Sequence, residues 1–61
     1  MKSKEVIKII KADDWYEVRQ KGSHVQFKHL IKKGLVTVAK GNKDVAKGTL
    51  ANIWRQAQLG L

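Results

Sequence analysis

The sequence predicts an α+β fold in which a helix, three antiparallel strands and a second helix follow one another in the order α-β-β-β-α. Two changes of hydrophobic period indicate this order: helical spacing near the amino end gives way to alternation from Trp15 to Ala39, and helical spacing returns near Thr49. Short turn-forming segments separate the alternating stretches and favour an antiparallel meander. We expect one three-stranded sheet with both helices on one face, because that face buries both apolar helix stripes.

The first predicted helix begins at Ser3, which favours the N-cap position, and Glu5 in its first turn complements the helix dipole. Its apolar stripe has helical spacing and consists of Val6, Ile7 and Ile10. The pair Asp13-Asp14 favours a turn that ends the helix. We interpret the stripe as a face packed on the core; a membrane-surface helix is the alternative, because basic residues also flank an apolar stripe there.

The three strands are predicted from alternation and turn chemistry. Residues 15–20 and 25–29 alternate between apolar or long side chains and polar ones, and Lys21-Gly22-Ser23 between them has the composition of a hairpin turn. A second turn at Lys32-Lys33-Gly34 leads into residues 35–39, whose β-branched content favours a strand.

The last part of the chain predicts a loop and a helix. Residues 40–47 are polar, contain Gly41-Asn42 and carry three lysines, so we expect an ordered loop. The helix opens at Thr49 or just before it, Gly60 is its expected stop, and its apolar stripe consists of Leu50, Ile53, Trp54 and Ala57. This order of elements is that of the double-stranded-RNA-binding-domain architecture, which by itself does not establish a function.

Composition limits the functional classes. The 61 residues allow one domain, residues 1–61, and the absence of cysteine together with only two histidines argues against a disulfide framework or a structural zinc site. The formal net charge of +8 favours nucleic acid, an anionic membrane surface or an acidic protein as partner. Lys8 and Lys11 interrupt the first apolar stretch, so it is no signal peptide or membrane span, and we expect a cytoplasmic protein without membrane contact.

His24 is the strongest candidate for chemistry. The sequence lacks spaced carboxylate pairs and a phosphate-binding loop motif, and adjacent Ser23 and His24 point to opposite faces of a strand, which argues against a serine-histidine couple. We expect the ring of His24 at the sheet edge beside Lys21 and Lys28, where imidazole can take a proton from a ribose 2′-hydroxyl while lysines hold the phosphate. An exposed hairpin histidine is more often inert, however, and the same holds for His29.

Two further groups of residues have alternative interpretations. Lys40, Lys43 and Lys47 precede the second helix, whose free amides favour an anion, so they form either a phosphate site or a solvated loop. The aromatic residues are candidates for base stacking, but most are expected in the core of so small a chain. The stacking candidates are Trp15, Tyr16 and Phe27, and the core candidates are Trp15, Phe27 and Trp54.

Nearly the whole chain resembles the HicA-type toxins of bacterial HicAB toxin–antitoxin systems. The resemblance lies in VRQKGSHVQFKH, in VTVAKGNKDVAKGTL and in the terminal helix with Ile53 and Arg55-Gln56-Ala57. Its most specific part is Gly22-Ser23-His24 followed by Phe27 and His29, with Lys47-Gly48-Thr49-Leu50 at the head of the last helix.

The resemblance implies a translation-inhibiting endoribonuclease (mRNA interferase) with one catalytic histidine, His24, no metal or other cofactor, and a HicB-type antitoxin that covers the active face. A chain of charge +8 suits an acidic partner. We expect His29 as an auxiliary group and an RNA-binding set of Lys21, Gly22, Ser23, Lys28, Lys40, Lys43 and Lys47.

This chain departs from the family pattern at several positions. Val25 stands where many members carry a second histidine, Leu30 and Ala39 stand at positions often occupied by proline, and the usual closing Gln-Ala-Gly-Leu is Gln56-Ala57-Gln58-Leu59. Two rival functions follow from the charge: a non-catalytic RNA-binding module of the same fold, and a structural protein that binds an acidic partner.

Overall fold

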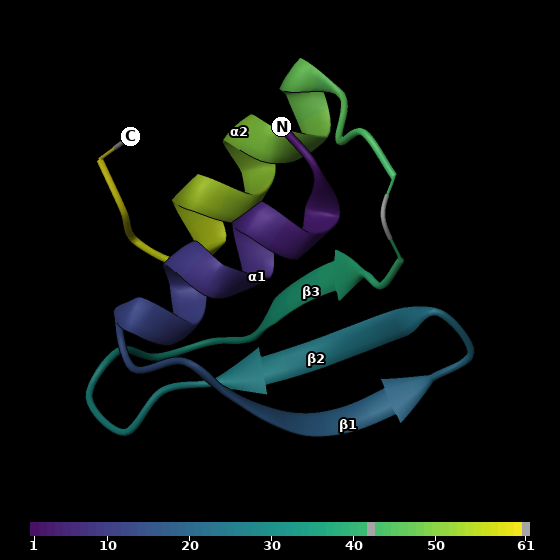
Figure 1. Cartoon of the computed structure of the whole chain (residues 1–61). Helices are drawn as coiled ribbons and strands as arrows, with labels where there is room; N and C mark the ends of the chain where they lie inside the picture. Colours follow the sequence, from purple (N-terminus) through teal and green to yellow (C-terminus); the bar gives the residue numbers. More distant parts are fainter. Residues whose placement is uncertain (42, 61) are drawn as a thin grey trace.

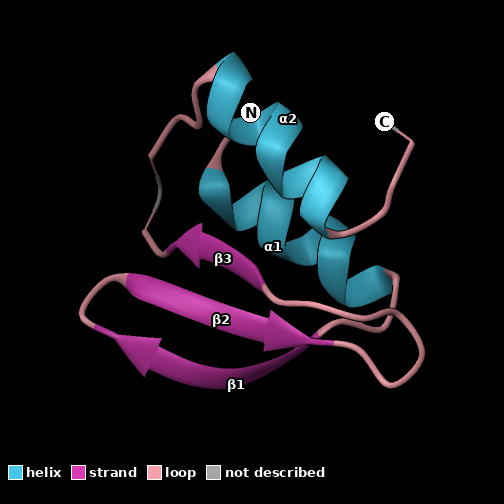
Figure 2. Cartoon of the chain, turned by 180° about the vertical axis from the view of Figure 1, so that it is seen from behind, coloured by secondary structure: helices cyan, strands magenta, loops and turns pink. Residues whose placement is uncertain are grey.

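The computed structural model describes residues 1–41 and 43–60 and confirms the predicted α+β order. The elements are α1 (Ser3–Ala12), β1 (Tyr16–Lys21), β2 (His24–Lys28), β3 (Val36–Ala39) and α2 (Lys47–Gln56). The strands form one antiparallel sheet in the order β1-β2-β3, and both helices cover the same face (Figures 1 and 2). No helix formed by the described residues covers the other face of the sheet.

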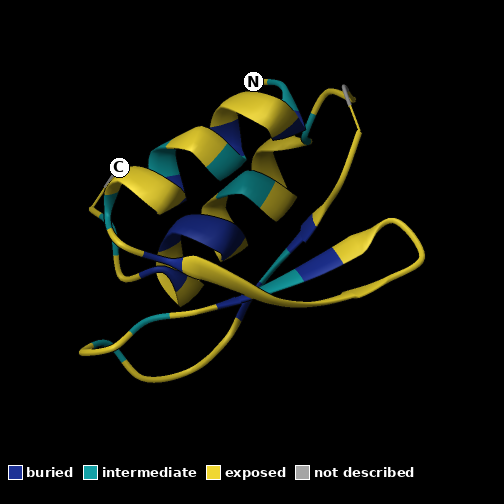
Figure 3. Cartoon of the chain, turned by 60° about the horizontal axis from the view of Figure 1, so that its bottom comes forward, coloured by how far each residue is buried: buried dark blue, intermediate teal, exposed yellow. Residues whose placement is uncertain are grey.

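The core lies between the helices and the sheet, and Figure 3 shows its buried positions in dark blue. It consists of Val6, Ile10, Trp15, Val25, Phe27, Val36, Val38, Ile53, Trp54 and Ala57. The burial of Val6 and Ile10 confirms that the stripe of α1 packs on the core rather than on a membrane surface. The core prediction for both tryptophans and Phe27 is likewise confirmed.

β1 is an exposed edge strand. Alternation correctly predicted a strand here, but it does not produce a buried side of the strand, because every residue of Tyr16–Lys21 is exposed. Within the predicted strand, residues 15–20, Trp15 alone is buried, and it lies just before β1. The helices contact β3, at the opposite edge of the sheet, so β1 extends beyond the surface that they cover.

The start of α1 differs from the prediction. Lys2 occupies the N-cap position and Ser3 is the first helical residue, almost completely buried. The hydroxyl of Ser3 donates a hydrogen bond to the carbonyl oxygen of Gly41, and its backbone N–H donates to the carbonyl oxygen of Lys43 at 2.8 Å. Ser3 therefore joins α1 to the loop between β3 and α2 rather than capping its own helix.

Both helices end in a Schellman motif, in which a residue with positive φ follows the helix. At the end of α1 this residue is Asp14 (φ 73°), and the N–H of Trp15 donates to Ile10 at 3.1 Å. At the end of α2 it is Gln58 (φ 57°), and the N–H of Leu59 donates to Trp54 at 2.9 Å. Asp13-Asp14 thus ends its helix as predicted, whereas Gln58, and not Gly60, ends the second.

In the described part of the chain, residues 1–41 and 43–60, neither helix has the length and hydropathy that a membrane crossing requires.

Candidate functional site

A two-residue turn positions His24. Lys21 and His24 are paired across the β1–β2 hairpin, and Gly22 and Ser23 connect them. Gly22 has φ 59° and Ser23 has no positive φ, the combination of a type II′ turn with glycine at its first central position. His24 is therefore the exposed first residue of β2, directly opposite Lys21.

The position of His24 in the sheet differs from the expectation in one respect. β2 pairs with both neighbours, so His24 lies at the end of the middle strand rather than on an edge strand. Lys28 is on the same side of the sheet, because both residues alternate with the buried Val25 and Phe27. At a rise of about 3.3 Å per residue, however, the two Cα atoms are about 13 Å apart. Lys21 is thus adjacent to His24 and Lys28 is not.

His24 lines a pocket of about 360 Å³ that β3, the loop after it and the start of α2 complete. The lining residues are Ser3, His24, Thr37, Val38, Ala39, Lys43, Asp44, Val45, Ala46, Thr49 and Ile53. The first residues of the chain fix this loop: the N–H of Val45 donates to the carbonyl oxygen of Met1 at 2.9 Å, and Lys2 Nζ lies 3.4 Å from Asp44 Oδ1. The fold therefore places Lys43, from a distant part of the sequence, in the lining of the same pocket as His24.

The amino end of α2 faces the same pocket through Ala46 and Thr49. The first hydrogen bond of the helix runs from the N–H of Leu50 to the carbonyl oxygen of Ala46, at 2.8 Å. The amides that precede Leu50 in the first turn, with the positive end of the helix dipole, are suited to an anion. Lys47 was predicted to be the last residue of the loop, but it is the first residue of α2, and it is exposed.

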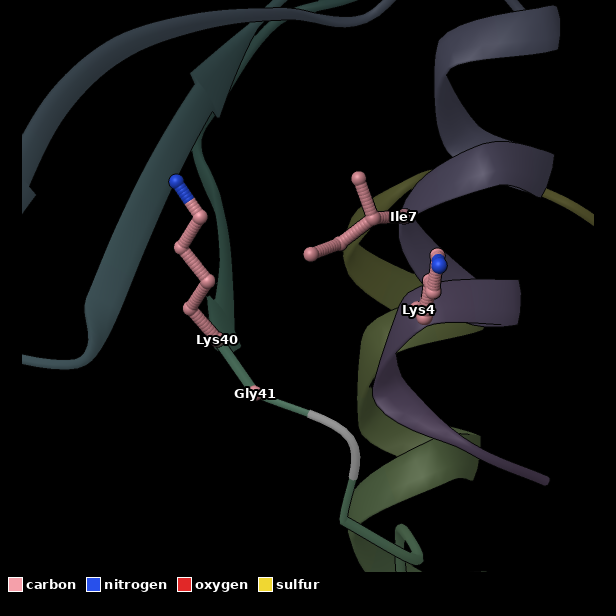
Figure 4. A pocket seen from close by; sticks show the side chains of 4 residues that line it. All are labelled: Lys4, Ile7, Lys40 and Gly41. Carbon is pink, nitrogen blue, oxygen red and sulfur yellow. The ribbon is translucent and has the colours of Figure 1, made fainter.

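Lys40 contacts the β1–β2 hairpin. Its N–H donates to the carbonyl oxygen of Ser23 at 2.5 Å, and its Nζ lies 3.4 Å from Gln20 Oε1, so it braces the hairpin next to His24. It also lines a second pocket of about 380 Å³ with Lys4, Ile7 and Gly41. Figure 4 shows Lys40 and Ile7 on opposite sides of this pocket. Of the predicted loop lysines, Lys40 and Lys43 therefore line different pockets. Asn42, which the loop prediction included, lies outside the described residues.

His29 is not near His24. It follows β2 at the opposite end of the strand, with its ring packed edge-on against Trp15 at a centroid distance of 5.2 Å. Its Nδ1 accepts hydrogen bonds from the N–H groups of Ile31 and Lys32, each at 3.0 Å, and its Nε2 lies 2.6 Å from the carbonyl oxygen of Asp13. Two donors on Nδ1 place the proton on Nε2. These contacts hold the loop after β2.

The sequence indicated Lys32 only as part of a turn, yet its side chain connects the carboxyl ends of both helices. Its Nζ donates to Asp13 Oδ2 at 2.6 Å and to the carbonyl oxygens of Ala57 and Gln58 at 3.1 and 3.3 Å. The hydrogen bond from this ammonium lowers the pKa of Asp13 below its ordinary value of 3.8. The partners of Lys32 are remote in sequence, so no local pattern indicates them.

Arg19 is a second residue whose position no local sequence pattern indicates. The pairing between β1 and β2 contains an irregularity between Glu17 and Arg19, which places Arg19 opposite Gln26. Gln26 is on the same face of β2 as His24. Arg19 therefore belongs to the histidine side of the sheet.

Comparison with known proteins identifies the family of this chain. A family model described as the HicA toxin of bacterial toxin–antitoxin systems matches residues 3–59, a range that includes all five elements and every residue of the His24 pocket. No curated protein matches the chain. The chain belongs to the HicA toxin family.

Proposed function

We propose that this toxin is an endoribonuclease that cleaves mRNA with His24 as its catalytic residue and so inhibits translation and growth. The observation that carries the proposal is the pocket that His24, Lys43 and the amino end of α2 line together. A proton acceptor and two sources of positive charge from separate elements are what phosphodiester cleavage requires at one place.

The reaction needs only the groups of the RNA and of this pocket. His24 takes the proton of a ribose 2′-hydroxyl, the 2′-oxygen forms a bond to phosphorus, and the bond from phosphorus to the 5′-oxygen breaks. The proton is returned to the 5′-oxygen by the imidazolium or by water. Lys43 and the first-turn amides of α2 stabilise the charge that develops on the phosphate oxygens. The mechanism is metal-independent.

The remaining residues of the proposed RNA-binding set have distinct roles. Lys21 contacts the phosphate next to His24, and Lys28 holds the RNA about 13 Å further along β2. Gly22 and Ser23 form the turn that presents the ring. Lys40 holds that turn through Ser23, and exposed Lys47 adds charge at the head of α2.

A HicB-type antitoxin is the proposed protein partner. The chain carries a net charge of +8, and the surface around His24 includes Lys21 and Lys43. An acidic antitoxin that covers this surface blocks RNA and the histidine at once. Because the proposed substrate is mRNA in translation, we place the action of the toxin in the cytoplasm.

The test is cleavage of a labelled RNA by purified protein in the presence of a metal chelator. The unmodified chain should cleave, and His24→Ala should lose cleavage and growth inhibition while it retains its fold, because exposed side chains contribute little to stability. His29→Ala, which removes the other histidine, is the matched control and should retain cleavage in its folded state. Toxicity in the His24→Ala variant would contradict the proposal.

The second candidate is an RNA-binding module without catalysis, which the absence of a second histidine at position 25 favours. Val25, however, is completely buried on the helix side of the sheet, whereas His24 faces the other side. A side chain at position 25 is thus not directed at the RNA atoms that His24 would contact. The module would bind RNA in the assay above and leave it intact.

A further inference from the structure

In the part of the chain that the structure describes, nothing covers the face of the sheet opposite the helices. The residues of this face follow from the pairing register. His24, Gln26 and Lys28 alternate with the buried side chains of β2, and their cross-strand partners share their face. This open face consists of Tyr16, Arg19 and Lys21 from β1, His24, Gln26 and Lys28 from β2, and Thr37 and Ala39 from β3.

The charged residues of the open face are all basic. Arg19, Lys21 and Lys28 are exposed on it, and none of its residues, all of which belong to the described part of the chain, is acidic. Glu17, the acidic residue of β1, is paired with Phe27 and so belongs to the helix side. A surface of one sign, continuous with His24, attracts an anionic polymer.

The irregularity in β1 creates this charge. With strict alternation from Tyr16, the open face of β1 would carry Val18 and Gln20. The extra residue between Glu17 and Arg19 shifts the phase, so that Arg19 and Lys21 face this side instead. One inserted residue thus replaces two uncharged side chains by two cations.

Tyr16 supplies an apolar surface at the far end of this face. It pairs with Lys28, and its side chain is 44% exposed, in contrast to the buried Trp15 and Phe27. Exposed aromatic side chains beside cations bind single strands, because unpaired bases stack on the ring while the backbone contacts the charges.

We propose that the open face binds single-stranded RNA, with a base on Tyr16 and phosphates on Arg19 and Lys28, and delivers the strand to His24. This inference rests on the proposed function, since it concerns the RNA that His24 cleaves. A duplex fits this face less well, because its bases are paired and offer no free ring to Tyr16. The substrate class is therefore single-stranded RNA despite the resemblance of the fold to a duplex-binding domain.

The test is a binding measurement by fluorescence anisotropy in the His24→Ala background, where RNA is not consumed. The probes are a labelled single-stranded RNA of mixed sequence and a duplex of equal charge. Arg19→Gln with Lys28→Gln should weaken single-strand binding at least tenfold and reduce the slope of log affinity against log salt by about 1.4, or 0.7 for each lost contact.

The matched control is Lys8→Gln with Lys11→Gln, which removes the same charge from exposed positions on α1. Because α1 covers the other face of the sheet, this variant should weaken binding less than threefold. Tyr16→Ala should weaken binding about fivefold, near the lower limit for loss of one stacked base, and Tyr16→Phe should retain it.

Three outcomes overturn the inference: equal losses in the two double variants, tighter binding of the duplex than of the single strand, and no measurable binding of either RNA. Cleavage by the unmodified chain is scored separately. If the unmodified chain cleaves RNA and the Arg19 and Lys28 variants bind and cleave normally, this inference fails and the proposed function stands. If binding follows the expected pattern and no RNA is cleaved, the proposed function fails and the open face remains a single-strand site.

Discussion

His29 and Asp13 are joined through the ring of the histidine, whose Nε2 lies 2.6 Å from the carbonyl oxygen of Asp13 at the end of α1. The other ring nitrogen accepts two backbone N–H groups of the loop after β2. A single neutral side chain therefore connects the end of α1 to the loop after β2. This contact lies at the opposite end of β2 from His24.

The ring of His29 is expected to serve stability rather than catalysis. His29→Ala should lower the free energy of unfolding by about 1–3 kcal/mol, because it leaves partly buried backbone groups without their partner and removes the contact with Trp15. Denaturant unfolding measures this loss, and cleavage assayed well below the unfolding midpoint should be unchanged. A folded His29→Ala variant that does not cleave would instead establish the auxiliary role considered from the sequence.

The sequence pattern predicts the position of His24 but not the role of His29. Period and turn chemistry located the hairpin and hence His24 beside Lys21, because both depend on residues that are adjacent in the chain. The role of His29 depends on Asp13 and on the amides of Ile31 and Lys32, which only the fold brings to its ring. The phase shift that turns Arg19 to the open face is likewise set by pairing with β2.

The contact between Lys32 and Asp13 should make stability depend on pH. The lowered pKa of Asp13 means that the ionised form binds Lys32 in the folded chain, so the stabilisation is fully present above about pH 5 and is lost as the pH falls through the folded pKa. Thermal unfolding should show a lower midpoint for Asp13→Asn than for the unmodified chain at pH 7. The difference should shrink progressively as the pH falls below about 5 and through the lowered pKa of Asp13.

Asp14→Asn is the control for this experiment. It removes the neighbouring carboxylate, and asparagine also tolerates the positive φ of 73° at this position. Its unfolding midpoint should remain closer to that of the unmodified chain at pH 7. A difference between Asp13→Asn and the unmodified chain that is constant from pH 7 to pH 3 would show that the ion pair is not its cause.

Gln58 should carry backbone strain, because it is a side chain at the positive-φ position that glycine favours at the end of a helix. The family pattern has glycine at this place. Gln58→Gly should raise the free energy of unfolding by about 0.5–1 kcal/mol. The comparison is Gln58→Ala, since both variants lose the hydrogen bond from Gln58 Nε2 to Lys33, at 3.0 Å, and only the glycine relieves the strain. Equal stabilities of these two variants would contradict the interpretation.

Local sequence preferences did not predict the carboxyl end of α2 or the N-cap of α1 correctly. Gly60 was the nearest glycine and therefore the predicted stop, yet the hydrogen bonds of the motif close at Gln58 because Leu59 packs against the core next to Trp54. Serine is a residue type that favours the N-cap position, but the hydroxyl of Ser3 donates its hydrogen bond to the carbonyl oxygen of Gly41 and not to its own helix. In both cases a tertiary contact outweighs a local preference.

Gly22 should be required for its backbone conformation and not for lack of space. Among the described residues other than Gly22 and its two chain neighbours, no heavy atom lies within 4 Å of the position that a Cβ would occupy, so Gly22→Ala introduces only the strain of φ 59° in the turn before His24. This change should lower the free energy of unfolding by about 1 kcal/mol, and Gly22→Asn by less, because asparagine tolerates positive φ. Denaturant unfolding of both variants measures the difference.

Gly48 offers the matched comparison, because it is also in open space but has a helical conformation in the first turn of α2. Gly48→Ala should raise the free energy of unfolding by about 0.5 kcal/mol, since alanine favours the helix. The same change of residue should thus have opposite signs at the two positions. Destabilisation of similar size at both would show that the added methyl group, and not the backbone angle of the turn that presents His24, decides the effect.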